Sequence, residues 1–183
     1  LEEAAALADN AQDGELGYEI RELMLETALM IGDHNRLLVA FAWCLAQADK
    51  DPDNFDDTKI LWAYRWVISV SPAFLGISRA KIEELFTDMT RRYSEYGCSL
   101  RPIHMLRRNV AIDMGDKIMA ATASKNWARA RRDWFCDDQV AERAFTVNYC
   151  RFMNKHTQVL AHAAPFMSHE IRDDHFEEQV FRK

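Results

Sequence analysis

The stretch Asp113-Met114-Gly115-Asp116 decides the fold. It lies between two apolar patterns of helical period, and a glycine followed by an aspartate is typical of a tight turn between two helices. The glycine ends the first helix, and the aspartate caps the second. The same loop can be laid on Met30-Ile31-Gly32-Asp33 and on Phe152-Met153-Asn154-Lys155. The sequence therefore predicts a unit of two helices and a short loop that recurs along the chain.

The loops are spaced by multiples of one unit length. Gly32 and Gly115 are 83 residues apart, and Gly115 and Asn154 are 39 apart. Since 83 is about twice 41, one further and degenerate unit fits near Phe74. A helix pair cannot bury its apolar stripe alone, so the units must stack around a continuous core. The predicted fold class is all-α: a right-handed α-solenoid of about four antiparallel helix pairs, with seven to ten helices.

Apolar residues at helical spacing place these helices on the sequence. No run alternates as a strand does, so a sheet is not expected. Four alanines that follow the second and third loops are expected to be buried where helices approach closely: Ala120, Ala123, Ala161 and Ala163. The expected helices are 18–31, 33–45, 59–70, 78–96, 102–114, 116–132, 139–153, 156–168 and a short one within 170–183.

Composition indicates a folded domain. The chain has 183 residues, of which 49% are apolar, with six Gly and four Pro, which excludes disorder. The apolar runs are too short for a membrane span. The widely spaced Cys44, Cys98, Cys136 and Cys150 favour a reducing, cytoplasmic setting and core packing over disulfides. Since the first residue is Leu, we expect the chain to be a segment of a longer protein.

Charge is distributed unevenly along the chain. The net charge is −6, yet the segment from Arg91 to Arg132 has ten basic and three acidic residues, so it carries +7 and the remainder −13. Such segregation predicts either a local field directed at an anionic partner or an attraction between the two zones within the fold. Both interpretations stay open at this point.

The helix pairs resemble tetratricopeptide repeats, in which a Gly-Asp turn joins helix A to helix B and small residues of helix B admit its neighbour. Met114-Gly115-Asp116, followed by Ala120 and Ala123, matches that pattern best. The unit at Met153-Asn154-Lys155 matches less closely, and the first unit has Leu37 where a small residue belongs. The spacing near 40 exceeds the 34 that is usual for the family. Other helical repeats therefore remain alternatives.

The resemblance implies a single tetratricopeptide-like domain over 1–183. Its repeat core is expected at about 16–168, and 169–183 is expected to be a C-terminal capping segment. The stretch Arg132-Asp133-Trp134-Phe135-Cys136 also looks like a segment of some bacterial tetratricopeptide-like proteins. A second Cys follows three places later in those proteins, whereas this chain has Gln139. A Cys-x-x-Cys metal site is therefore not supported.

The resemblance also implies a binding groove, because helix A lines the concave face in that family and the position six residues before the loop faces the groove. Here this position is Glu26, Asn109 and Asn148 in the three recognisable units. An amide offers a donor and an acceptor at once, and nearby guanidinium groups add charge for a carboxylate. The alternative is that both Asn are ordinary polar residues of solvated helix faces. The expected partner-binding residues are Asn109, Asn148, Arg107, Arg108, Arg143 and Arg151.

Partner binding is thus the predicted function: a cytoplasmic protein-protein interaction scaffold that holds a peptide or protein partner, in one version an acidic or carboxylate-bearing one. The alternative is a nucleic-acid-binding helical repeat that contacts phosphates. An enzyme of unrecognised type is the third interpretation, since no phosphate loop, nucleophile elbow or His-Glu-x-x-His pattern occurs. The residues of the nucleic-acid alternative are Arg101, Lys125, Arg129, Arg131 and Arg132.

No cofactor, metal or membrane is expected. The acidic stretch 49–57 imitates the start of a calcium loop, but it has Asn54 where that loop needs Gly and Ile60 where it needs Glu. His162, His169 and His175 gather near acidic residues. We interpret them as a cluster of polar residues on the surface and not as a metal site, because Pro165 separates the first two.

Overall fold

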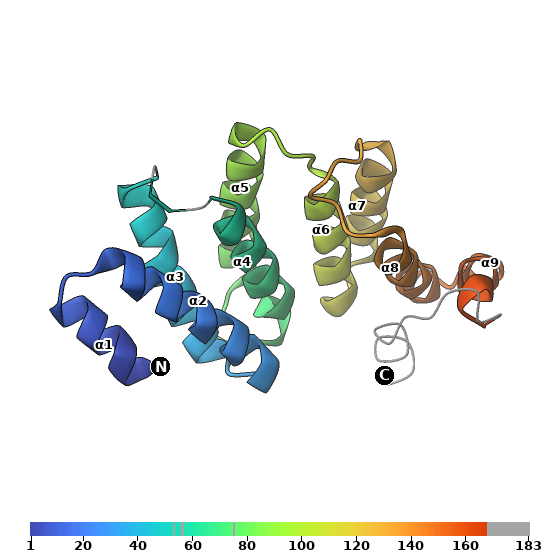
Figure 1. Cartoon of the computed structure of the whole chain (residues 1–183). Coiled ribbons are helices and arrows are strands. Elements are labelled where there is room, and N and C mark those ends of the chain that lie inside the picture. The colour runs from blue at the N-terminus through green and yellow to red at the C-terminus, as the bar shows by residue number, and fades with distance from the viewer. Residues whose placement is uncertain (53, 56, 75, 168–183) are drawn as a thin grey trace. The chain divides into compact units, whose positions relative to one another are not determined.

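The computed structural model describes residues 1–52, 54–55, 57–74 and 76–167. Within these residues it contains nine α-helices and one short 3-10 turn, and no strand (Figure 1). The prediction of an all-α protein with seven to ten helices is confirmed. The elements are α1 (Glu2–Asn10), α2 (Gly14–Ile31), α3 (His34–Lys50), α4 (Asp57–Val70), η1 (Ser71–Ala73), α5 (Arg79–Glu95), α6 (Arg101–Asp113), α7 (Lys117–Arg129), α8 (Gln139–Phe152) and α9 (His156–Met167).

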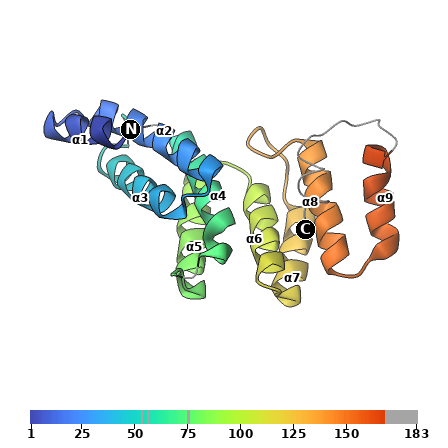
Figure 2. The same cartoon turned by 90° about the horizontal axis from the view of Figure 1, so that it is seen from below.

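The helices pack in sequential pairs, and the chain divides into two compact units, Leu1–Arg92 and Tyr93–Lys183. In the first unit α2 packs on α3, with α1 against α2 and α4 against α3. In the second unit α6 packs on α7, α8 packs on α9, and α6 also contacts α8. Figure 2 shows the short loops that join α6 to α7 and α8 to α9. The single-domain expectation for 1–183 stays a prediction.

The three predicted loops share one geometry. Gly32, Gly115 and Asn154 all adopt the left-handed conformation, with φ of 72°, 72° and 57°. In each loop the next amide donates back into the preceding helix: Asp33 to Ala28 O at 2.9 Å, Asp116 to Ala111 O at 2.8 Å, and Lys155 to Cys150 O at 2.8 Å. This bond satisfies a carbonyl that the end of a helix leaves unpaired. The superposition of these loops is therefore confirmed.

The degenerate unit near Phe74 is a helix pair with a different connection. The 3-10 turn η1 ends α4, and the Phe74 amide donates to Ser71 O at 3.1 Å. Helix α5 begins only at Arg79. A hydrogen bond from the Tyr64 hydroxyl of α4 to Asp88 of α5 connects the two helices. Because this longer connection has no Gly-Asp turn, its loop does not superpose on the other three.

Three of the four expected alanines are buried, namely Ala120, Ala123 and Ala163. The prediction for Ala161 is wrong, because that residue is exposed. Helix α9 packs on α8 through Val159, Ala163 and Phe166. These residues share one helix face, and Ala161 lies outside it.

Helix α1 was not expected from the sequence, which placed the start of the repeat core near residue 16. It packs on α2 through the buried Ala5 and Ala8. Ion pairs from Asp9 to Arg21 at 2.7 Å and from Glu2 to Arg36 at 2.8 Å hold its two ends. The predicted capping segment 169–183 lies outside the described residues.

Candidate partner-binding site

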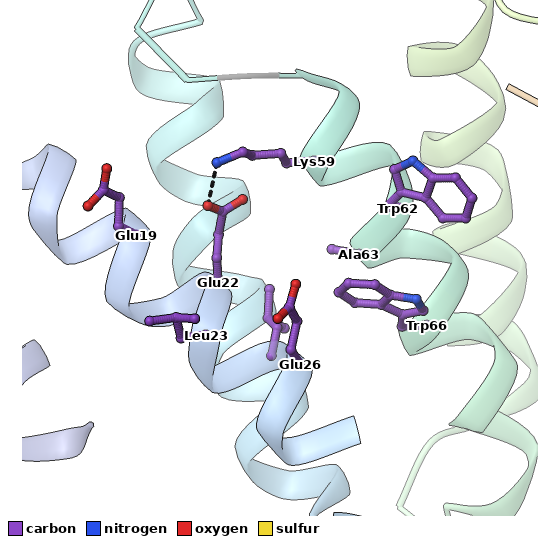
Figure 3. Close-up of a pocket in the computed structure, with 9 residues that line it drawn as sticks. Glu19, Glu22, Leu23, Glu26, Lys59, Trp62, Ala63 and Trp66 are labelled. Carbon is purple, nitrogen blue, oxygen red and sulfur yellow. Dashed lines mark hydrogen bonds and ion pairs between the residues drawn. The ribbon is translucent and has the colours of Figure 1, made fainter. Parts of the chain in front are cut away.

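A groove with a volume of about 580 Å³ runs between α2 and α4 in the first unit (Figure 3). Helix α2 contributes mainly carboxylates, and helix α4 contributes two indole rings and one ammonium group. The lining residues are Glu19, Glu22, Leu23, Leu25 and Glu26 from α2, and Lys59, Trp62, Ala63 and Trp66 from α4.

The two walls of the groove are built from equivalent positions. Residues 19, 22, 23 and 26 line it from α2, and residues 59, 62, 63 and 66 line it from α4. Each set has the spacing of a single helix face. Every member of the second set lies 40 residues after its counterpart, which is the unit length that the loops indicate. The groove therefore repeats one helix face in two successive helix pairs.

The groove carries an excess of negative charge. Glu22 forms an ion pair with Lys59 across it, at 2.6 Å between Oε2 and Nζ. Glu19 and Glu26 are exposed, and their side chains form no ion pair or hydrogen bond with any residue that the structure describes. Two carboxylates thus remain available to a cationic group that enters the groove.

Apolar surface lies beside these carboxylates. Leu23 is 53% exposed and Trp62 is 39% exposed. The guanidinium of Arg65 already lies over the Trp62 ring, 4.3 Å from its centroid. An aromatic face next to unpaired carboxylates is the environment that Lys and Arg side chains prefer, because both the charge and the apolar stem find a partner.

The tryptophans of this chain lie at the edge of the core rather than inside it. None of the five is among the buried residues, and Trp62 and Trp134 are exposed. A tryptophan side chain is large, so it is rarely covered completely, and its indole N–H usually finds a hydrogen-bond partner or water. Trp62 and Trp66 therefore remain accessible in the α2–α4 groove.

The position six residues before the loop has different surroundings in the three units. Glu26 lines the α2–α4 groove, as expected. Asn109 and Asn148 are half-buried, and the Asn109 Oδ1 atom is buried without a hydrogen bond to the described residues. The binding role of both Asn stays a prediction.

The four arginines assigned to partner binding are placed very differently. Arg151 is exposed, and Arg107 and Arg143 are half-buried. Arg108 is fully buried, at 0% exposure, so it does not face an open groove. Its position differs from the expected one because the face of α6 that bears it is covered by α7 and α8, whose Trp127 and Tyr149 rings lie against its guanidinium.

The basic segment is partly neutralised within the fold. Arg101 donates to both oxygens of Glu142, at 2.8 and 3.0 Å, and to the Trp127 and Ala130 carbonyls at 2.9 and 3.2 Å. Arg132 also donates to Glu142, and Arg131 donates to Gly97 O at 2.8 Å. The hydrogen bonds that Arg101 donates to Glu142 raise the pKa of Arg101 further. Pairing within the fold, one of the two interpretations of the charge segregation, therefore applies to Arg101 and Arg132, and Arg108 is buried.

A smaller basic groove, with a volume of about 420 Å³, lies at the start of α6 and the end of α7. Its charged and polar lining residues are Ser99, His104, Asn126, Arg129 and Arg131. Arg129 and the neighbouring Lys125 are exposed and have no hydrogen bond or ion pair within the part of the chain that the structure describes. Burial, and to a smaller extent Arg107, lower the pKa of His104, so this imidazole is neutral at pH 7.

The cysteines act as packing groups. All four are free, and Cys44, Cys98 and Cys150 are buried, which confirms core packing for these three. Cys136 is only half-buried. Burial raises the pKa of each thiol, that of Cys44 to about 12. None is therefore an activated thiolate at neutral pH.

No group of three His, Cys, Asp or Glu among the described residues is arranged to hold a metal ion. No helix among them is long and apolar enough to cross a membrane. Asp53 of the calcium-like stretch, together with His169 and His175, lies outside the described residues.

Comparison with protein-family models, curated proteins and solved structures finds no match to this chain. The fold and the groove therefore define only a class: an all-helical protein whose described helices pack in sequential pairs.

Proposed function

We propose that this protein is an interaction module that holds a basic segment of a partner polypeptide in the α2–α4 groove. The observation that carries the proposal is the pairing of two uncompensated carboxylates, Glu19 and Glu26, with the exposed faces of Trp62 and Leu23 in one groove. In one version of the sequence-based prediction the partner is acidic, on the basis of the Arg91 to Arg132 segment. The α2–α4 groove carries an excess of negative charge instead, so the partner we propose is basic.

We also propose that the helix pairs stack as a tetratricopeptide-like solenoid. The 40-residue offset between the two walls of the groove supports this arrangement, as do the three equivalent loops. In such a stack α2 and α4 are the A helices of successive units, and a partner chain lies along them. The groove then uses one helix face repeatedly, which suits an extended peptide.

The chemistry of the groove sets how strong the contact is. An exposed ion pair contributes about 0–1 kcal/mol, and a cation over an exposed ring about 0.5–1 kcal/mol. One Lys or Arg therefore gives weak binding, and a useful affinity requires at least two basic side chains together with apolar contact to Leu23 and Trp62. The expected ligand is a segment in which basic and apolar residues are interspersed.

Matched peptides test the proposal. We expect a peptide of alternating Lys and Leu to quench the fluorescence of Trp62 and Trp66, and a Glu-Leu peptide of the same length to leave it unchanged. The double variant Glu19→Gln/Glu26→Gln should weaken the Lys-Leu peptide about tenfold or more. The control Glu3→Gln/Glu15→Gln removes the same charge from exposed positions outside the groove. Equal losses in both variants would show non-specific attraction and reject this site.

A second candidate function is nucleic-acid binding at the basic groove beside α6 and α7. The exposed and unpaired Lys125 and Arg129, next to Arg131, favour it. Against it, Arg101 and Arg132 are already paired with Glu142, so few cations are left for phosphates. A double variant Lys125→Gln/Arg129→Gln should reduce both the affinity for single-stranded RNA and its salt dependence. If RNA does not bind at low salt, this candidate is rejected. An enzymatic role stays the third interpretation.

A further inference from the structure

Arg108 is the most unusual residue of the second unit. It lies in the middle of α6 with 0% exposure. Its Nε and both terminal nitrogens are buried and donate no hydrogen bond to the described residues. Burial lowers its pKa to about 10, so the guanidinium keeps its charge at neutral pH. Buried charges in proteins are normally paired and hydrogen-bonded.

Two aromatic rings and a further donor surround Arg108. The centroids of the Trp127 ring on α7 and the Tyr149 ring on α8 lie 5.1 and 5.6 Å from its Cζ atom. The indole Nε1 of Trp127 is itself buried without a hydrogen bond to the described residues. The guanidinium group of Arg108 and the indole N–H of Trp127 thus both lie at the junction of α6, α7 and α8, and neither donates a side-chain hydrogen bond to the described residues.

The carboxylate in this region is already committed. Both oxygens of Glu142 accept hydrogen bonds from Arg101, which lies two helical turns before Arg108 on the same face of α6. Arg132 donates to Glu142 as well. Transfer of Glu142 to Arg108 would leave Arg101 without its ion pair. The Arg108 nitrogens therefore make no hydrogen bond within the described residues, and Glu142, whose charge acts on Arg108, is engaged by Arg101 and Arg132.

We propose that the α6–α7–α8 junction is a carboxylate-binding site, with Arg108 as the bidentate donor and Trp127 Nε1 as a second donor. The planar guanidinium fork matches the two oxygens of a carboxylate, and the flanking rings exclude water from the pair. A small carboxylate enters when the helices separate locally, because the nitrogens are closed to solvent. This site lies in the second unit and does not depend on the α2–α4 groove.

Carboxylates can come from two sources. One is a free small carboxylate, and the other is the acidic side chains of residues 168–183, which lie outside the described residues. The test therefore uses the full chain in two forms: the natural sequence, and a variant with amides at Glu170, Asp173, Asp174, Glu177 and Glu178. Acetate is the probe, titrated at pH 7 and constant ionic strength, with chloride as the reference anion.

The readout is the indole N–H resonance of Trp127 in a ¹H–¹⁵N spectrum, assigned with Trp127→Phe. We expect a saturable shift with acetate that the same concentration of chloride does not cause. A response in the natural chain indicates a free carboxylate as ligand, and a response only in the amide variant assigns the ligand to residues 168–183. Arg108→Met should weaken acetate binding at least about tenfold, whereas Arg129→Met, at an exposed position, should not.

The proposal is overturned in two ways. If acetate shifts the resonance in neither form of the chain, the guanidinium is hydrated by buried water rather than paired with a carboxylate. If chloride causes the same saturable shift as acetate, the site does not select carboxylates. Should Arg108→Met fail to fold, Arg108→Lys keeps the charge but not the fork, and the titration of the unsubstituted chain remains decisive.

Discussion

At the scale of single residues, the second unit depends on Glu142. This carboxylate is buried and receives hydrogen bonds from Arg101 and Arg132. Glu142→Gln keeps the shape but removes the charge that compensates two guanidinium groups. We expect a loss of about 3 kcal/mol in unfolding free energy, since breaking a buried ion pair leaves an uncompensated charge. Urea unfolding followed by circular dichroism measures it.

The control for this prediction is Arg132→Met. The Arg132 side chain is 39% exposed, and its removal leaves the bidentate Arg101–Glu142 pair intact. A partly exposed ion pair contributes about 0–1 kcal/mol, so this variant should lose much less stability than Glu142→Gln. Comparable losses in the two variants would mean that the network is not organised around the Arg101–Glu142 pair.

A second prediction at this scale concerns Asp88 and pH. Burial acts to raise the pKa of Asp88, but hydrogen bonds from Tyr64, Arg91 and Arg92 outweigh it and hold this pKa below its usual range. A carboxyl group whose pKa is lowered in the folded state stabilises the fold at pH values above its pKa in the unfolded state, which is about 3.9. That contribution is lost as the pH falls through the folded-state value.

Asp88→Asn tests this linkage. The variant should be less stable than the natural chain at pH 7, and the difference should shrink as the pH falls below about 4. Thermal unfolding midpoints from pH 7 to pH 2.5 measure the difference. A constant gap across this range would show that Asp88 contributes by packing and not by its charge. Glu84→Gln, whose exposed ion pair with Lys81 is weak, is the control.

The candidate site could be predicted only in part, because the sequence does not show which neighbouring helix covers each residue. The offset of six residues placed Glu26 correctly, because a loop fixes the register of the helix before it. The same offset could not reveal that Arg108 is buried, because burial depends on which neighbouring helix covers α6. Glu19 and Glu22 were missed, although a signal was present: their spacing recurs 40 residues later at Lys59 and Trp62.

At the scale of elements, the left-handed loop positions carry the third prediction. Gly115 has φ of +72° with no atom within 4 Å of an added Cβ, so Gly115→Ala should cost only the backbone strain, about 1–2 kcal/mol. Asn154 has φ of 57°, and Asn154→Gly should be neutral or stabilising because glycine adopts this conformation without strain. Chemical denaturation compares the two variants. A stabilising Gly115→Ala would contradict the equivalence of the loops.

The elements themselves were largely predictable. The helices around Gly32 and Gly115 follow from the glycine stop and the aspartate cap, which act locally. Helix α1 was not predicted, because its stability comes from packing on α2 and from ion pairs with Arg21 and Arg36. The exposure of Ala161 likewise depends on which face α9 turns to α8. Contacts that are distant in sequence, rather than local propensity, decide these cases.

At the scale of the whole molecule, the sign of the charge separates the two candidate functions. The chain carries −6 overall, and several of its basic residues are paired within the fold. The net negative charge of the chain therefore attracts a basic partner from a distance. The same charge repels nucleic acid, which only the local basic groove beside α6 and α7 attracts.

The last prediction follows from this field. The rate at which a Lys-Leu peptide associates with the full chain should fall steeply as salt rises, because the Debye length shortens from about 30 Å at 0.01 M to about 3 Å at 1 M. The dissociation rate should change less, since it depends on short-range contacts in the groove. Stopped-flow tryptophan fluorescence measures both rates. Glu19→Gln/Glu26→Gln should chiefly raise the dissociation rate, while Glu3→Gln/Glu15→Gln should affect only association. If salt leaves the association rate unchanged, the field does not steer the partner, and the basic-peptide proposal loses its electrostatic support.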